Sequence, residues 1–327
     1  MRMAIIGAGA WGTALAVALS KRHAVGLWTR SAIHAQDMRK ARCNQRYLPD
    51  SAFPAGIEIE SDLGQVVSAA QLILIATPTS ALRETCRKLA SLGTVAPLIW
   101  ACKGFEGESA CLPHEIVASE LPGLQCAVLS GPSFAQEVAR GQPTALILAS
   151  RDLEFARTTA ANLHQKTLRI YYAEDVIGVE IAAAVKNVMA IATGICDGMK
   201  LGMNARAALI TRGLAEIARL GRSMGGQAET FMGLAGAGDL ILTCTGDLSR
   251  NRRVGLQLAE GTSIEAILKL LGHVAEGVHS ARAVRRMAVE KGVDMPITNA
   301  VCEILFEGKS AQSVLSELLA RDPKLEC

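Results

Sequence analysis

A glycine-rich turn at the start of the chain constrains its fold more than any other feature. The turn has the spacing Gly7-x-Gly9-x-x-Gly12, follows an apolar run at residues 3–6 and opens a helical segment at residues 13–19. A strand, a glycine turn and a helix in this order hold the pyrophosphate of a dinucleotide. Gly7 permits the tight turn, Gly9 lets the pyrophosphate approach the backbone, and Gly12 lets the helix pack closely on the strand. The N–H groups at the helix start, with the helix dipole behind them, then bind the anion.

The glycine triplet has an alternative interpretation as an ordinary strand–helix turn, because glycine-rich turns are common in proteins. Its position favours dinucleotide binding, since the triplet follows the first predicted strand and opens the first predicted helix. We therefore expect a dinucleotide cofactor.

Further apolar runs of strand length alternate with helical segments in the first half of the chain. They lie at residues 24–28, 72–76, 97–102, 125–129, 145–149 and 168–172. This alternation predicts an α/β fold with a Rossmann-like doubly wound sheet. Ligands of such sheets bind off the carboxyl ends of the strands. We therefore expect the loops after the strands to converge, namely residues 7–12, 29–30, 77–78, 103–104 and 131–133.

The pattern changes at about residue 175, after which strand-like runs disappear. Helical spacing then recurs at residues 177–193, 205–224, 264–271, 281–291 and 311–319. Glycine-containing breaks separate these segments, and residues 233–238 read as a flexible turn. We predict a dinucleotide-binding domain at residues 1–180 and an all-helical substrate domain at residues 181–327.

Composition restricts the class of protein. The chain has 327 residues, of which 50% are hydrophobic, and 34 basic against 31 acidic side chains give a net charge of +3. So small an excess provides no general attraction to nucleic acid or to an anionic membrane. The nine cysteines contain no CxxC pair and the six histidines no HxxxH pair, so no metal is expected. With no signal peptide or membrane-spanning run, we expect a cytoplasmic protein with free thiols.

The segment after the second strand bears on the type of dinucleotide. Proteins that prefer NAD usually place an acidic residue there for the ribose 2′-hydroxyl. No Asp or Glu lies between Ala24 and Gln36, and Arg30 follows the strand directly. An arginine at this position pairs with a 2′-phosphate, which favours NADP(H) over NAD(H). A solvated surface arginine is the alternative.

Lys186 is the candidate for acid–base chemistry, because it lies alone in an almost wholly apolar helix. A lysine in such surroundings needs a partner or a pocket, and desolvation shifts a buried lysine toward the neutral form, which suits proton exchange with a substrate oxygen. A lysine whose ammonium group reaches the surface is an equally good interpretation.

The densest cationic segment is Ser249-Arg250-Asn251-Arg252-Arg253. Arginine forks suit phosphate recognition, although such a patch is often only a solvated face. Upstream, Asp239 ends the glycine-rich segment, where it either accepts hydrogen bonds from a polyol or caps the following helix.

These segments together resemble the bacterial-type NAD(P)-dependent glycerol-3-phosphate dehydrogenases. The resemblance extends from the first strand to about Pro296 and rests on motifs in the same order, namely residues 7–14, 103–104, 130–135, 184–187, 211–213, 235–240, 249–252 and 274–277.

The resemblance implies a role for individual residues. Lys186 is similar to the family's proton acceptor and donor on the C2 oxygen. The residues that match substrate contacts are Lys103, Gly131, Ser133, Asp239, Ser249, Arg250 and Asn251. Those that match cofactor contacts, in addition to the glycines, are Ala10, Trp11, Arg30, Tyr47, Lys103, Ala135, Arg250, Val274 and Glu276.

The resemblance also implies an activity. We expect interconversion of dihydroxyacetone phosphate and sn-glycerol 3-phosphate by hydride transfer, with NADP(H) preferred and NAD(H) accepted. The product would supply phospholipid synthesis, and a homodimer is expected. Three alternatives stay open at this point: a dehydrogenase for another alcohol or hydroxy acid, a nicotinamide-binding sensor without turnover, and a nucleic-acid-binding protein, which the near-neutral charge disfavours.

Overall fold

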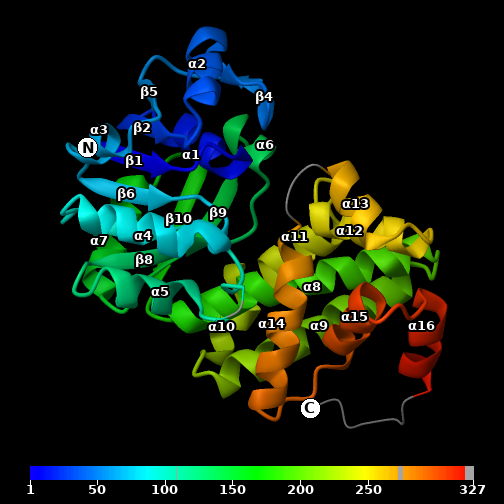
Figure 1. Ribbon diagram of the computed structural model, residues 1–327. Helices are drawn as coiled ribbons and strands as arrows, with labels where there is room; N and C mark the ends of the chain where they lie inside the picture. Colours follow the sequence, from blue (N-terminus) through cyan, green and yellow to red (C-terminus); the bar gives the residue numbers. More distant parts are fainter. Residues whose placement is uncertain (108, 272–274, 321–327) are drawn as a thin grey trace. The chain divides into compact units, whose positions relative to one another are not determined.

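The computed structural model describes residues 1–107, 109–271 and 275–320. The chain divides into two compact units, Met1–Glu180 and Ile181–Cys327 (Figure 1). Among the described residues, the first is an α/β unit and the second has helices and no strand.

An eight-stranded sheet with the order β10-β9-β8-β7-β6-β1-β2-β5 forms the centre of the first unit. Its strands are β1 (Arg2–Ile6), β2 (Ala24–Trp28), β5 (Ile57–Glu60), β6 (Leu72–Ile75), β7 (Leu98–Trp100), β8 (Cys126–Ser130), β9 (Thr144–Ala149) and β10 (Leu168–Ala173). All neighbouring strands pair in parallel except β8 and β9, which are antiparallel. The doubly wound fold class is therefore confirmed, with a reversal at β9 that the sequence did not predict.

Helices cover both faces of this sheet. They are α1 (Ala10–Leu19), α2 (Ala32–Ala41), α3 (Leu63–Val67), α4 (Leu82–Ser91), α5 (Pro113–Glu120), α6 (Ala135–Ala139) and α7 (Leu153–Leu163), with a 3₁₀ turn, η1 (Thr79–Ala81). Met3 and Ile5 of β1 belong to an apolar cluster that also contains residues of α1, α2, α6 and α7. Ala4 and Ile6, which point to the other face, are also fully buried. Parallel strands buried on both faces carry continuous apolar runs, which is why the sequence revealed them.

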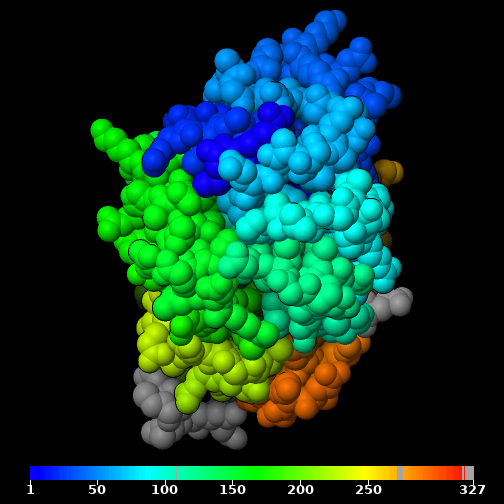
Figure 2. Space-filling view, turned by 90° about the vertical axis from the view of Figure 1, so that its left-hand side faces the viewer, coloured from blue at the N-terminus to red at the C-terminus, as the bar shows by residue number. Residues whose placement is uncertain are grey.

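Figure 2 shows the blue N-terminal segments, which include α2 beside the sheet edge of β2 and β5, above the cyan and green segments that contain α4 and α7. Strand β5 was not predicted, although its sequence, Ile-Glu-Ile-Glu, alternates with the period of a strand. Ile57 and Ile59 are buried, whereas Glu58 and Glu60 pair with Arg2 and with an arginine of α2. The short hairpin of β3 (Cys43–Asn44) and β4 (Leu48–Ala52) was likewise not predicted.

The second unit contains α8 (Val176–Gly198), which starts in the first unit, α9 (Met203–Ser223), α10 (Ala228–Met232), α11 (Asp239–Thr245), α12 (Arg250–Ala259), α13 (Ile264–Leu271), α14 (Glu276–Glu290), α15 (Pro296–Phe306) and α16 (Ala311–Leu319). In the described part of the chain, α8 alone is long and apolar enough to cross a membrane, and 94% of its most apolar window is buried. Burial inside the protein accounts for this apolar sequence. The expected flexible turn at residues 233–238 is wrong: Leu234–Gly238 is a π-helical turn, η2, that continues into α11.

Candidate active site

The glycine loop has the geometry that its sequence predicts. Gly7 has φ +113°, which L side chains rarely adopt, and a Cβ there would lie 2.9 Å from the Ala76 carbonyl carbon. A Cβ on Gly12 would overlap the Gly7 carbonyl oxygen. Gly9 is the N-cap of α1, and a Cβ there would meet nothing within 4 Å. The loop thus leaves open space at the position where a pyrophosphate would approach the first-turn N–H groups of α1, which Ala10 and Trp11 begin.

Asn44, which sequence reasoning missed, supports this loop from behind. Its side chain is fully buried, and Nδ2 donates to the Ala8 carbonyl oxygen at 2.9 Å and to Thr13 Oγ1 at 2.8 Å. Its Oδ1 contacts His34 Nε2 at 3.1 Å. The only sequence signal was an asparagine in a polar segment, which is too common to indicate such a role.

The end of β2 lies next to the glycine loop, since the Gly7 N–H donates to the Trp28 carbonyl oxygen at 3.0 Å. Arg30 follows two residues later and its side chain is exposed. Tyr47 is partly buried, and its ring meets the His34 ring edge to face at 5.6 Å. Because His34 contacts Asn44, the segment of Tyr47 is connected to the support of the loop.

Strands β7 and β8 end at the same edge of the sheet as β1, because these strands share one direction. Lys103 lies in the loop after β7, where its carbonyl oxygen accepts from Thr79 Oγ1 at 2.8 Å. Gly131 and Ser133 lie in the loop after β8, and Ser133 Oγ donates to the Gly131 carbonyl oxygen at 3.0 Å. Ala135 begins α6, which packs on α1. The first unit therefore brings these predicted residues to the edge that carries the glycine loop.

Lys186 is buried, with 5% of its surface exposed, and Asp239 has 1% exposed. Lys186 Nζ donates to Asp239 Oδ1 at 2.5 Å and to Thr243 Oγ1 at 2.8 Å. The Lys186 ammonium group therefore does not reach the surface. Asp239 does not cap α11, because its carboxylate accepts from Lys186 and the N-cap of α11 is Gly238. Sequence reasoning missed Thr243, which lies one helical turn after Asp239 on α11.

A second polar cluster lies beside Lys186 on α8. Asn251 Nδ2 donates to Asn187 Oδ1 at 3.0 Å, and Asn251 Oδ1 accepts from the Gly277 N–H at 3.0 Å. Asn187 Nδ2 reaches Glu276 Oε2 at 3.5 Å. These contacts join α8, the first turn of α12 and the first turn of α14. Val274, the remaining predicted cofactor contact, lies outside the described residues.

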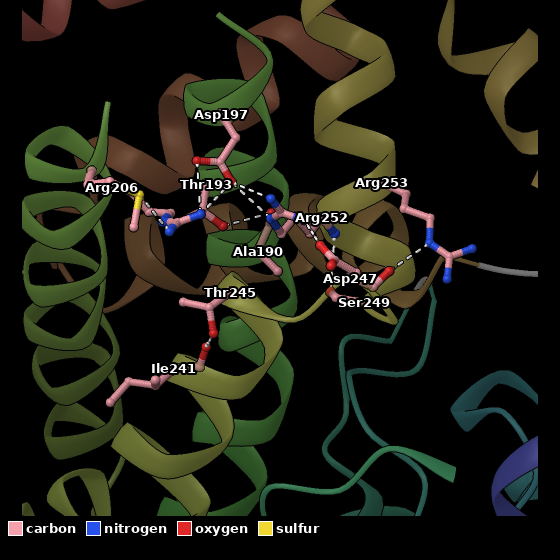
Figure 3. Close-up of polar contacts among 11 residues, drawn as sticks. Ala190, Thr193, Asp197, Arg206, Ile241, Thr245, Asp247, Ser249, Arg252 and Arg253 are labelled. Atoms are coloured by element: carbon pink, nitrogen blue, oxygen red, sulfur yellow. Dashed lines mark hydrogen bonds and ion pairs between the residues drawn. The ribbon is translucent and has the colours of Figure 1, made fainter. Parts of the chain in front are cut away.

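The cationic segment forms the N-terminus of α12. Ser249 is the N-cap, and its Oγ accepts from the Arg252 N–H at 3.3 Å. Figure 3 shows that Arg252 points to Asp197 and Asp247, while Arg253 Nε donates to the Asp247 carbonyl oxygen at 3.1 Å. Arg250 is exposed, and no hydrogen bond or ion pair involves its side chain within the described residues. Arg252 and Arg253 therefore make contacts within the second unit, whereas Arg250 is available to an anion.

An open, mostly parallel sheet with this glycine loop after its first strand is the fold of a dinucleotide-binding protein. Models of the NAD-dependent glycerol-3-phosphate dehydrogenase N-terminus and C-terminus match residues 2–156 and 175–316. A "Glycerol-3-phosphate dehydrogenase [NAD(P)+]" from Nitrosospira multiformis is 56% identical and covers 100% of this chain and 99% of its own length. The relative of that name from Thiobacillus denitrificans is 54% identical over the full length of both chains.

The crystal structure of the glycerol-3-phosphate dehydrogenase from Coxiella burnetii, 43% identical, superposes with a TM-score of 0.94 and covers 98% of this chain and 99% of its own. The chain belongs to the NAD-dependent glycerol-3-phosphate dehydrogenase family. The resemblance inferred from the sequence motifs is confirmed, and with it the assignment to NAD(P)-dependent dehydrogenases acting on a small molecule. A nicotinamide sensor and a nucleic-acid-binding protein lose their support.

Proposed function

We propose that the chain reduces dihydroxyacetone phosphate to sn-glycerol 3-phosphate, with Lys186 as the proton donor and NADPH as the preferred reductant. The buried contact of Lys186 with Asp239 and Thr243 carries this proposal. A lysine that is desolvated, hydrogen-bonded and held beside a polar cluster is oriented for proton transfer to a bound substrate.

The cofactor would be held by the first-turn N–H groups of α1 and by the residues assigned to it from the sequence. Gly7, Gly9 and Gly12 shape the pyrophosphate site, and the open space above Gly9 fits that group. The further proposed contacts are Ala10, Trp11, Arg30, Tyr47, Lys103, Ala135, Arg250, Val274 and Glu276. When bound, the reduced nicotinamide supplies the hydride for the C2 carbonyl carbon.

Lys186 then balances the reaction at the oxygen. As the carbonyl carbon gains the hydride, negative charge develops on the C2 oxygen, and the Lys186 ammonium donates a proton to it. In the oxidation of glycerol 3-phosphate, the neutral amine takes the hydroxyl proton back. Asp239 and Thr243 hold Nζ in one place, so the lysine need not search for its position at each turnover.

The substrate phosphate would bind at the N-terminus of α12. Ser249 uses its oxygen as an acceptor for the cap, which leaves its hydroxyl hydrogen free to donate. The N–H groups of the first turn and the exposed Arg250 add further donors. Asn251 donates to Asn187, the residue that follows Lys186 on α8. Lys103, Gly131 and Ser133 are proposed to complete the substrate contacts.

The family resemblance leads us to propose further a cytoplasmic homodimer that supplies glycerol 3-phosphate for phospholipid synthesis. Light scattering after size-exclusion chromatography tests the dimer: twice the chain mass of 34.5 kDa supports it, and a single chain mass contradicts it.

The function itself is tested by the oxidation of NADPH and of NADH by the purified protein, with and without dihydroxyacetone phosphate. We expect turnover that requires the ketone phosphate and has the higher kcat/KM with NADPH. Turnover of a different ketone with none of dihydroxyacetone phosphate would contradict the proposed substrate. A higher kcat/KM with NADH would contradict the proposed cofactor preference.

A further inference from the structure

Two residues that the proposed reaction does not use, Asp197 and Arg252, join α8 to the proposed phosphate site. Arg252 Nη2 and Nε contact Asp197 Oδ2 at 2.8 and 2.9 Å, and Arg252 Nη1 contacts Asp247 Oδ1 at 3.0 Å. Arg206 of α9 reaches the same Asp197 oxygen at 3.2 Å (Figure 3). The side chains of Asp197, Arg206 and Arg252 are 15%, 17% and 12% exposed, so solvent screens the contacts among these three only weakly, whereas Asp247 is 95% exposed.

The cluster includes Arg252, which lies in the first turn of α12, the turn proposed to bind the substrate phosphate. Arg252 is the third residue of α12, and its backbone N–H donates the capping hydrogen bond to Ser249 Oγ. Arg250 and Asn251 precede it in the same turn. Any rotation of that turn changes the direction of the Arg250 side chain and of the first-turn N–H groups together.

Three residues of the helix that carries Lys186 contact this turn. Asn187 holds Asn251, and a Cβ on Gly194 would overlap the Arg252 carbonyl oxygen, so the two backbones touch there. Asp197 then holds the Arg252 side chain three residues further along α8. The glycine contact sets the distance between the helices, whereas the directional Arg252–Asp197 contact fixes the rotation of the turn.

We propose that Asp197 and Arg252 are positioning residues for phosphate recognition: their ion pair fixes the first turn of α12 so that Arg250 and the neighbouring donors meet the substrate phosphate while its carbonyl lies at Lys186. The proposal rests on the proposed function, because it assumes that the substrate phosphate binds at α12. Arg252 itself does not bind the phosphate, since its three guanidinium nitrogens are used by Asp197 and Asp247.

The test compares dihydroxyacetone phosphate with dihydroxyacetone, which lacks the phosphate, in the wild type and in Asp197→Asn. The ratio of the two kcat/KM values measures phosphate recognition, and because both substrates use the same cofactor, a change in cofactor binding cancels from it. We expect this ratio to fall roughly tenfold to a hundredfold in Asp197→Asn, through a higher KM for the phosphate substrate. This is the factor that loss of one hydrogen bond to a charged group brings.

Two further variants make the outcome decisive. Arg252→Lys keeps the charge but loses the fork, so it should retain part of the ratio and serves if Asp197→Asn does not fold. Glu307→Gln breaks an ion pair with Arg285 elsewhere in the second unit and should leave the ratio unchanged. An equal loss on both substrates, or an unchanged ratio in folded Asp197→Asn, overturns the proposal. A wild type that does not prefer the phosphorylated ketone instead refutes the proposed function.

Discussion

The proposed preference for NADPH over NADH rests on Arg30. Its side chain is exposed at the end of β2, and the strand end is hydrogen-bonded to the glycine loop. A guanidinium group there can hold a 2′-phosphate through charge-assisted hydrogen bonds, which a 2′-hydroxyl cannot match.

Replacement of Arg30 by glutamine should therefore raise the KM for NADPH about tenfold to a hundredfold, the effect of one lost charged contact. The KM for NADH should change little. Steady-state kinetics with both cofactors measure the two effects, and Lys40→Gln, which removes an exposed cation from the neighbouring helix α2, is the matched control. Equal changes for both cofactors would contradict a role in cofactor choice.

The individual site residues differ in whether the sequence alone could predict their roles. The roles of Gly7 and Gly12 could be predicted because they depend on backbone geometry within a few residues. The need of Lys186 for a partner could be inferred from its apolar helix, but the partner could not, because Asp239 is 53 residues away in the chain. The support that Asn44 gives the loop and the pairing of Arg252 with Asp197 could not be inferred for the same reason: these contacts depend on tertiary structure.

At the scale of elements, the crossing of α8 and α12 depends on two glycines. A Cβ on Gly194 would overlap the Arg252 carbonyl oxygen, and a Cβ on Gly255 would overlap the Ile191 carbonyl oxygen. Backbone atoms cannot move aside as the end of a flexible side chain can, so the helices would have to separate.

We expect Gly194→Ala to lower the free energy of unfolding by about 1–3 kcal/mol, the usual cost of overpacking, and to reduce activity because the Lys186 helix and α12 move apart. Urea denaturation and kcat/KM for the ketone phosphate measure these effects. Gly233→Ala is the control, because its nearest contacts are an ordinary 3.5 Å. Equal stability of Gly194→Ala and the wild type would show that the helices are not in close contact.

The N-terminus of another helix, α15, is hydrogen-bonded to a buried carboxylate. Glu216 of α9 is 1% exposed and accepts from the Ile297 N–H at 2.6 Å and from the Thr298 N–H at 3.1 Å. Burial is the main cause that raises the pKa of Glu216 to about 7, against the opposing effect of these hydrogen bonds. The folded state therefore binds a proton more tightly than the unfolded state, whose glutamate titrates near 4.5.

This difference should make stability depend on pH. Between pH 4.5 and 7 the folded state holds more protons, so the free energy of unfolding contributed by Glu216 falls as pH rises and is lost above about pH 7. The contribution is on the order of 3 kcal/mol. Glu216→Gln does not titrate, so its unfolding free energy, measured by urea denaturation, should fall less steeply over this range than that of the wild type. Parallel pH profiles would contradict the assignment.

Some strands of the sheet could be predicted from the sequence and others could not. The strands β1, β6 and β8 were found because two-sided burial makes their central residues apolar. Strand β5 was missed because this edge strand alternates buried isoleucines with an exposed and a partly exposed glutamate. The antiparallel direction of β9 depends on how the chain returns after α6, which the hydrophobic pattern does not record.

At the scale of the whole molecule, the chain contains a cofactor-binding unit and a helical unit with different tasks in the proposed reaction. The first carries the glycine loop and Arg30, and the second carries Lys186 and the N-terminus of α12. Loss of Lys186 should therefore slow the chemical step and leave cofactor binding intact. This separation of cofactor binding from proton transfer underlies the proposed mechanism.

Its most direct test is the kcat of Lys186→Ala with dihydroxyacetone phosphate and NADPH, measured beside the dissociation constant of NADPH. We predict that kcat falls about 10²–10⁴-fold, the usual contribution of a positioned general acid, that the dissociation constant stays within about twofold (a factor worth less than 0.5 kcal/mol), and that added methylammonium restores part of the rate. A folded variant that binds NADPH and retains the wild-type kcat would contradict the account.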